Sequence, residues 1–263
     1  MIIKDVLNYL NNLYPPALAV DFDQDRIGLI IGDDHLELKN LLFALDLTLE
    51  VLQEAIDNKA NLIVTHHPFF FKPLFQVLFS TNEGKILKLM LEHQISLFVV
   101  HTNLDVGKGG VNDVLANLIG IENVKIVNDE PSKGNFLRYG NIPPLSLERL
   151  AKKIESQFNI SGVRVIGEGN RIISKVGVVG GSGAHDEDID VALRAGLDCY
   201  ITGEVKLPAA QKVYSQGLAL IEVNHGVEKL VFESLSKKME ADLALENRVL
   251  VAKTNTDPLY FLR

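Results

Sequence analysis

The chain has 263 residues, 47% of them hydrophobic and 23% charged, which is enough apolar mass for one large domain or two smaller ones. Its formal net charge of −8 argues against broad binding of nucleic acid or of a membrane surface through a basic face, but does not exclude a nucleotide as a small substrate. One cysteine excludes an internal disulfide framework, and no apolar stretch approaches the roughly 18 residues of a membrane span, so we expect a cytoplasmic protein.

In the first half of the chain, short apolar runs alternate with segments of helical spacing. Such alternation requires crossover connections and therefore predicts a mostly parallel sheet. Thr48 is a candidate N-cap of one helix, and Gly120 can close another. We expect strands at 41–46, 62–65 and 95–100, and helices at 48–60, 85–92 and 111–118.

The polar, turn-rich segment from Asn128 to Gly134 predicts a linker or an exposed loop. Beyond it we expect helices at 147–158, 186–195 and 226–239, and strands at 162–166, 175–179, 198–202, 218–223 and 249–252. The fold class is therefore α/β, with two lobes of mostly parallel sheets. The first lobe is residues 1–125 completed by 219–263, and the second is 126–218.

Two glycine-rich segments and the cysteine have ordinary structural explanations. Residues 107–110 precede a helix and 180–183 follow a strand, so either loop can cradle an anion. Neither has the spacing of a Walker loop or of a dinucleotide fingerprint, and tight turns explain both at least as well. Cys199 lies in an apolar stretch, so we expect a buried core thiol and not a nucleophile.

Polar, metal-capable side chains follow three apolar runs. His66 and His67 end the run at 61–65, and Pro68 stops the strand because proline cannot donate to the ladder. The other two segments are 101–105, with His101 and Asp105, and 224–228, with His225 and Glu228. Open α/β sheets place ligand sites at the carboxyl ends of their strands. Imidazoles bind borderline divalent metals, and carboxylates can bridge two of them.

Each of these residues also has a plain explanation. The pair His66-His67 can be a polar strand end, and His101 can cap its strand. Asp105 can cap a turn, and Glu228 can be a solvated helix carboxylate. The joint pattern is stronger, because four of the seven histidines end apolar runs. The remaining three have polar or glycine-rich neighbours and are expected at the surface; they are His35, His93 and His185.

The chain resembles the GTP cyclohydrolase 1 type 2 homologues, also described as dinuclear-metal-centre hexameric proteins. The resemblance implies a two-lobed α/β subunit, a homohexamer and two metal ions at the strand ends between the lobes. By motif match, the implied ligands are His66, His67, Asp105 and Glu228, with His101 beside the metals as the catalytic residue. The segments that carry the resemblance are DRIGL (25–29), ALDLT (44–48), THHP (65–68), HTNLD (101–105), GGVN (109–112), RYG (138–140), TGE (202–204) and NHGVE (224–228).

The last segment departs from the family pattern, which usually has His four residues before the Glu, where this chain has Asn224. Either His225 fills that coordination place by a local shift, or Asn224 binds weakly through its amide oxygen, or one metal is lost or held loosely. We favour His225, because imidazole is the better ligand and its i, i+3 spacing to Glu228 puts both on one helical face. Arg26 and the Leu207-Pro208 pair also depart from the pattern.

The leading interpretation is a metal-dependent hydrolase that acts on a nucleotide or another phosphate-containing small molecule. The family name suggests opening of the GTP imidazole ring with release of formate, with a metal-bound hydroxide as nucleophile and His101 moving protons. The alternative is a non-catalytic metal-binding or adaptor protein that acts through protein partners. The cofactor is expected to be two divalent ions per subunit, and a mixed imidazole and carboxylate site accepts Zn, Fe, Mn or Co.

Overall fold

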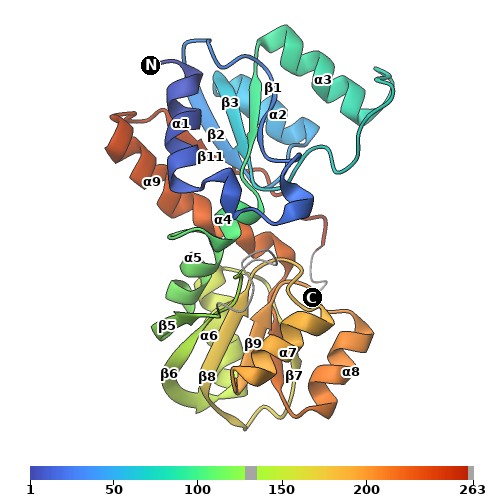
Figure 1. The fold of residues 1–263 in the computed structure, drawn as a ribbon, viewed down its shortest axis with the longest axis vertical. Helices are drawn as coiled ribbons and strands as arrows, with labels where there is room; N and C mark the ends of the chain where they lie inside the picture. Colours follow the sequence, from blue (N-terminus) through green and yellow to red (C-terminus); the bar gives the residue numbers. More distant parts are fainter. Residues whose placement is uncertain (128–134, 260–263) are drawn as a thin grey trace. The chain divides into compact units, whose positions relative to one another are not determined.

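The computed structural model describes residues 1–127 and 135–259, so the linker expected at 128–134 lies outside the described residues. Helices and strands alternate along the chain, and the strands form two sheets, which confirms the α/β class (Figure 1). The chain divides into two compact units, Met1–Lys108 with Phe232–Pro258, and Gly109–Val231 with Leu259. The boundaries between the units fall after residues 108 and 231, whereas the sequence suggested boundaries after 125 and 218. The first boundary is earlier because the helix at 111–119 packs on the second sheet.

The sheet of the first unit has the strand order β1-β4-β3-β2-β11. The strands β4, β3, β2 and β11 run parallel. The edge strand β1 pairs antiparallel with β4. The mostly parallel arrangement follows from the helical crossovers between the strands. The strands are β1 (Gly28–Ile31), β2 (Asn40–Ala44), β3 (Ala60–Thr65), β4 (Ser96–Val99) and β11 (Val249–Val251).

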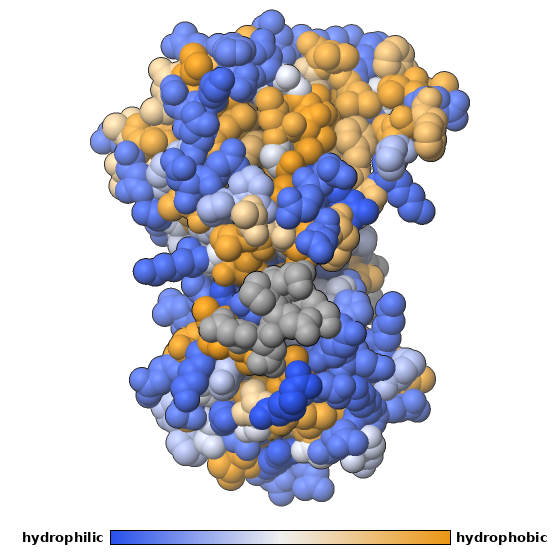
Figure 2. Space-filling view, viewed as in Figure 1, coloured by the Kyte–Doolittle hydropathy of each residue, from blue (hydrophilic) through white to orange (hydrophobic). Residues whose placement is uncertain are grey.

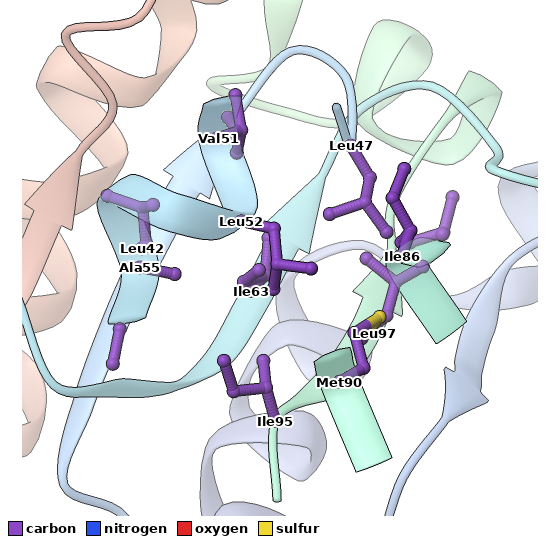
Figure 3. Packing of buried hydrophobic residues seen from close by; sticks show 13 residues of the cluster. Leu42, Leu47, Val51, Leu52, Ala55, Ile63, Ile86, Met90, Ile95 and Leu97 are labelled. Atoms are coloured by element: carbon purple, nitrogen blue, oxygen red, sulfur yellow. The ribbon is translucent and has the colours of Figure 1, made fainter. Parts of the chain in front are cut away.

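Helices cover both faces of this sheet, because successive side chains of a strand point to opposite sides. Leu42 of β2 belongs to a buried cluster with Leu52 and Met90 of the helices on one face (Figure 3). Phe43, the next residue, stacks on Phe232 of α9 on the other face, with ring centroids 5.0 Å apart. The helices are α1 (Ile3–Leu13), α2 (Leu49–Asp57), α3 (Asn82–His93), α4 (Thr102–Val106) and α9 (Val231–Leu243), with the 3₁₀ turns η1 (Pro16–Leu18) and η2 (Asp21–Asp23).

The sheet of the second unit has the order β5-β6-β8-β9-β10-β7. β8, β9 and β10 run parallel at its centre, whereas β5, β6 and β7 pair antiparallel, so this sheet is mixed. The strands are β5 (Glu122–Ile126), β6 (Arg138–Ser146), β7 (Arg164–Ile166), β8 (Ile172–Val179), β9 (Cys199–Thr202) and β10 (Ala219–Glu222).

Two helices lie on each face of the second sheet. α5 (Val111–Ile119) and α6 (Leu147–Phe158) contact each other and β8, while α7 (Asp186–Arg194) and α8 (Leu207–Ser215) form a buried cluster with the other face. The 3₁₀ turn η4 (His225–Leu230) follows β10. Cys199 is buried in β9, and this burial raises the pKa of its thiol, which confirms a core side chain. Among the described residues, no helix combines the length and apolarity that crossing a membrane requires.

Local sequence signals explain several element ends. The Thr48 side chain accepts a hydrogen bond from the Val51 N–H and caps α2, as expected. Gly120 has φ of 84°, a left-handed conformation that glycine adopts without steric cost, and it closes α5 as expected.

Candidate metal centre

The carboxyl ends of β3 and β4 bring three histidines to one edge of the first sheet. These strands are parallel neighbours, and Thr65 pairs with Val99 at their ends. His66 and His67 directly follow β3, and His101 follows β4 two residues beyond Val99. Because the strands end in register, the three imidazoles arrive at the same level. Sequence alone placed each of them at a strand end, and the parallel pairing makes them neighbours.

The three imidazoles form a compact group. The ring centroids are 5.0 Å apart for His66 and His67, 5.1 Å for His66 and His101, and 5.8 Å for His67 and His101. Taking one ring nitrogen from each, the three atoms lie within 4.8 Å of one another, a spacing that suits a shared metal ion. His66 is fully buried, whereas the side chains of His67 and His101 are each 16% exposed, so the group opens toward solvent on one side.

The Nδ1 atom of every one of these histidines faces an oxygen acceptor. His66 Nδ1 lies 3.0 Å from the Val100 carbonyl oxygen, which can only accept, so Nδ1 carries the proton. His67 Nδ1 lies 2.7 Å from Asp46 Oδ1, and His101 Nδ1 lies 2.6 Å from Asp23 Oδ2. A proton on Nδ1 leaves Nε2 of a neutral imidazole with its lone pair. This is the tautomer that binds a metal through Nε2.

The carboxylates of Asp46 and Asp23 are held in the ionised form. Burial raises the pKa of Asp46, but hydrogen bonds from His67 and Thr256 outweigh burial and lower it below its usual value. Burial likewise raises the pKa of Asp23, and hydrogen bonds from His101 and Thr102 bring it below its usual value. An ionised carboxylate only accepts, which keeps the proton on the histidine Nδ1.

Asp105 joins the group from the short helix α4. Its Oδ1 lies 3.5 Å from His66 Nε2, and its side chain is 10% exposed. α4 is anchored because the buried Asp23 carboxylate accepts from the Thr102 N–H and hydroxyl at the start of that helix. The imidazole lone pair and the carboxylate oxygen are both electron-pair donors, so their approach favours a cation between them.

The second unit carries its own group at the end of β10. His225 is the first residue of η4, where residues three apart eclipse one another, and its Nε2 lies 3.2 Å from Glu228 Oε2. Asn224 instead turns its Oδ1 to the Gly226 N–H at 2.7 Å, with a left-handed φ of 77°, and caps the turn. In the segment that departs from the family pattern, His225 therefore faces Glu228, whereas Asn224 caps the turn.

A carboxylate also orients His225. Its Nδ1 lies 2.9 Å from Glu204 Oε1, while Glu204 Oε2 accepts from the Ser182 hydroxyl at 2.8 Å. Burial raises the pKa of Glu204, and the hydrogen bonds from His225 and Ser182 outweigh it, so the pKa is lowered. The glycine turn at 180–183 has a steric role here: a Cβ on Gly181 would meet Glu228 Oε1 at 2.3 Å. The close approach of Glu228 explains the glycine at position 181.

The donor set suits a divalent transition metal. The histidines present Nε2 atoms whose protons have been placed on Nδ1 by second-sphere acceptors, and carboxylate oxygens approach two of them. Neutral imidazole with carboxylate is the ligand mixture of Zn, Fe, Mn and Co sites. The other three histidines, His35, His93 and His185, are exposed, as expected.

Sequence reasoning found the histidines but assigned no role to the three carboxylates that hold them. Asp46 lies two residues beyond the end of β2, so the strand-end argument that singled out His66 would have found it. Glu204 follows β9 at the same kind of position. Asp23 had no such signal, because it lies in a 3₁₀ turn far from any strand end.

Comparison with known proteins places this site in a family. A protein of Clostridium acetobutylicum named GTP cyclohydrolase 1 type 2 homolog is 30% identical over 267 residues, covering 98% of both chains. A protein of the same name from Clostridium perfringens is also 30% identical, over the full length of both. The crystal structure of the Staphylococcus aureus hypothetical protein SA1388 superposes with a TM-score of 0.90 at 30% identity, covering 100% of this chain and 99% of that one.

The family model described as Duf34/NIF3 (NGG1p interacting factor 3) matches residues 1–258. That range includes every element of both sheets and all the histidines and carboxylates described above. The chain therefore belongs to the Duf34/NIF3 family, and the resemblance seen in its motifs is confirmed.

Proposed function

We propose that this protein is a metal-dependent hydrolase with a dinuclear centre, whose ligands are His66, His67, Asp105, His225 and Glu228. The observation that carries the proposal is the group of three imidazoles with ring nitrogens within 4.8 Å of one another, each with an oxygen acceptor at Nδ1. Two divalent ions would supply a hydroxide nucleophile and stabilise a leaving oxygen. The Nδ1 atom of His101 faces Asp23, which leaves its Nε2 atom for moving protons.

The proposed substrate is a nucleotide or another phosphate-containing small molecule, with GTP ring opening as the first reaction to test. The name of the Clostridium relatives, GTP cyclohydrolase 1 type 2 homolog, supports this class. Phe71 supports it too, because its half-exposed ring lies edge-on to His101 with centroids 6.5 Å apart. An exposed aromatic ring beside a polar centre suits a planar base that stacks on it.

A second candidate is a non-catalytic metal-binding or adaptor protein. The family description names a factor that interacts with a protein, NGG1p. The segment between β3 and α3 also exposes an unusual number of large apolar side chains, as protein contact surfaces do. They are Phe71, Leu74, Phe75, Val77, Leu78 and Phe79.

We further propose that the protein is a cytoplasmic homohexamer, with the exposed 71–79 segment contacting a second copy of the chain. Figure 2 shows hydrophobic side chains at the upper right, where Figure 1 places the loop that enters α3. Phe75 is 98% exposed and Phe79 is 61% exposed, and clustered apolar surface of this kind marks a protein contact site. The single, buried cysteine fits a reducing compartment.

One experiment tests the metal centre and the activity together. Freshly purified wild type, His66→Ala and Asp105→Ala are analysed for bound metal, then stripped, reloaded with Zn, Mn, Fe or Co, and assayed on GTP and on a generic phosphodiester. We expect up to two ions per wild-type subunit and loss of most metal in both variants. Far-ultraviolet circular dichroism should be unchanged, because neither side chain belongs to the hydrophobic clusters that pack the helices on the sheets.

His93→Ala is the matched control, because His93 is an exposed histidine at the end of α3. Unchanged metal stoichiometry in both His66→Ala and Asp105→Ala would contradict the ligand assignment. Metal bound without turnover of any substrate would favour the adaptor function over the hydrolase.

A further inference from the structure

Three carboxylates outside the proposed ligand set each take the Nδ1 side of one histidine. We propose that Asp46, Asp23 and Glu204 are positioning residues. Asp46 and Glu204 direct the Nε2 lone pairs of the ligands His67 and His225 toward the metal ions, and Asp23 orients His101, which moves protons beside them. The inference rests on the proposed metal function. It adds that metal affinity depends on two residues that do not themselves contact the metal, Asp46 and Glu204, at independent places in the chain.

Asp46 is fixed so that one oxygen serves His67. Its Oδ1 accepts from His67 Nδ1 at 2.7 Å, and its Oδ2 accepts from the Thr256 hydroxyl. Both oxygens are therefore engaged within the first unit. The backbone of His67 is held as well, because its main-chain N–H donates to the Leu45 carbonyl at 2.9 Å. The imidazole plane and its tautomer are thus set before any metal arrives.

Asp23 holds His101 in a drier environment. The carboxylate is fully buried; its Oδ2 accepts from the Thr102 hydroxyl at 2.7 Å and the Thr102 N–H at 3.2 Å, and it lies 2.6 Å from His101 Nδ1. Burying a charge is costly unless donors surround it. All three contacts go to a single oxygen, and Oδ1 is buried with no hydrogen-bond partner among the described residues. A buried, ionised carboxylate whose oxygen faces one ring nitrogen of His101 fixes the orientation of that ring.

Glu204 repeats the arrangement in the second unit. One oxygen accepts from His225 Nδ1 at 2.9 Å and the other from the Ser182 hydroxyl at 2.8 Å, as Asp46 does with His67 and Thr256. His66 is the contrast, since its Nδ1 acceptor is the backbone carbonyl of Val100. A single side-chain substitution can therefore change the Nδ1 partner of His67, His101 or His225. The Nδ1 partner of His66 is a backbone carbonyl and cannot be changed in this way.

The test replaces the carboxylates by amides of the same shape in Asp46→Asn, Asp23→Asn and Glu204→Gln. Removing a second-sphere partner of a metal-binding histidine lowers metal affinity by about 10–100-fold. We therefore expect that loss for Co²⁺ in chelator competition with Asp46→Asn and Glu204→Gln, and unchanged affinity with Asp23→Asn, because His101 is not a proposed ligand. Nitrogen NMR of the metal-free protein reports the tautomer directly. In Asp46→Asn, the amide can present N–H to His67, so we expect a gain of the form protonated on Nε2. In Asp23→Asn, the Thr102 N–H keeps an oxygen at that position, so His101 keeps its tautomer.

Glu54→Gln is the matched control, because Glu54 also accepts from two backbone N–H groups and a hydroxyl in the first unit but contacts no histidine. The inference is overturned if Co²⁺ affinity is unchanged in Asp46→Asn and Glu204→Gln, or falls equally in Glu54→Gln. Circular dichroism checks folding, and each variant tests a different histidine if another does not fold. A wild type that binds no metal refutes the proposed function, while the tautomer of His67 in Asp46→Asn still decides the positioning role.

Discussion

At the residue scale, Asn224 and His225 are neighbours with separate tasks. Asn224 Oδ1 is committed to the Gly226 N–H, whereas His225 Nε2 faces Glu228. We therefore expect His225→Ala to lose metal affinity in a Co²⁺ titration. Asn224→Ala should keep that affinity and lower the free energy of unfolding by about 1 kcal/mol, the usual cost of removing a cap.

The two variants control for one another, because both shorten a side chain at the same turn. Normal metal binding by His225→Ala together with weak binding by Asn224→Ala would reverse the assignment. Tighter metal binding by Asn224→His would indicate that this chain carries a weakened version of the family site.

At the scale of the elements, Asp198 joins the starts of β8 and β9. Its Oδ2 accepts from the Ser174 N–H and hydroxyl at 2.9 Å and from the Lys175 N–H at 2.8 Å. Burial raises the pKa of Asp198, but these hydrogen bonds outweigh it and lower the pKa below the usual value. A carboxyl with a lowered folded-state pKa stabilises the fold above its unfolded pKa of about 3.9, and this contribution is lost as the pH falls through the folded-state pKa.

We expect Asp198→Asn to lower the free energy of unfolding by about 1–2 kcal/mol at pH 6, because the neutral amide accepts more weakly than a carboxylate. Urea denaturation from pH 6 down to pH 3 measures the difference from wild type, which should shrink as Asp198 itself becomes protonated. A difference that stays constant over this range would show that the charge is not what stabilises the β8–β9 connection.

At the scale of the whole molecule, the exposed segment 71–79 sets the expected assembly. Light scattering of the wild type should give a mass several times the 29.1 kDa of the chain, with six copies as the proposed number. Phe75→Asp should shift the protein to smaller species, because a charge at a desolvated contact is costly. Tyr214→Asp, at a similarly exposed aromatic on α8, is the control. A wild type of monomer mass at micromolar concentration would contradict the assembly.

The central elements of both sheets were predictable from sequence. The strands near 62–65, 95–100 and 198–202 are continuous apolar runs whose burial on both faces leaves little choice of conformation. The helices at 48–60, 111–118 and 147–158 have amphipathic spacing and local end signals such as Thr48 and Gly120. These signals lie within a few residues of one another along the chain.

The edge strands β7 and β11 were predicted, but β1, β5 and β6 were not, because their stability comes from partners remote in sequence. β6 contains two consecutive prolines, which argue against a strand, yet it pairs with β5 and β8 on its two sides. β5 is exposed along its whole length and has no apolar periodicity to detect. β1 is a short edge strand that begins at a glycine with a left-handed φ of 92°.

The sequence by itself determined that imidazoles end apolar strands, because strand-forming runs and the residues after them are local features. Only the tertiary structure decided which groups hold those imidazoles. Asp46 reaches His67 across 21 positions, Glu204 reaches His225 across 21, and Asp23 reaches Thr102 across 79. The direction of a lone pair depends on the acceptor at the other ring nitrogen. That acceptor is supplied by a neighbouring strand end or turn, which no local pattern specifies.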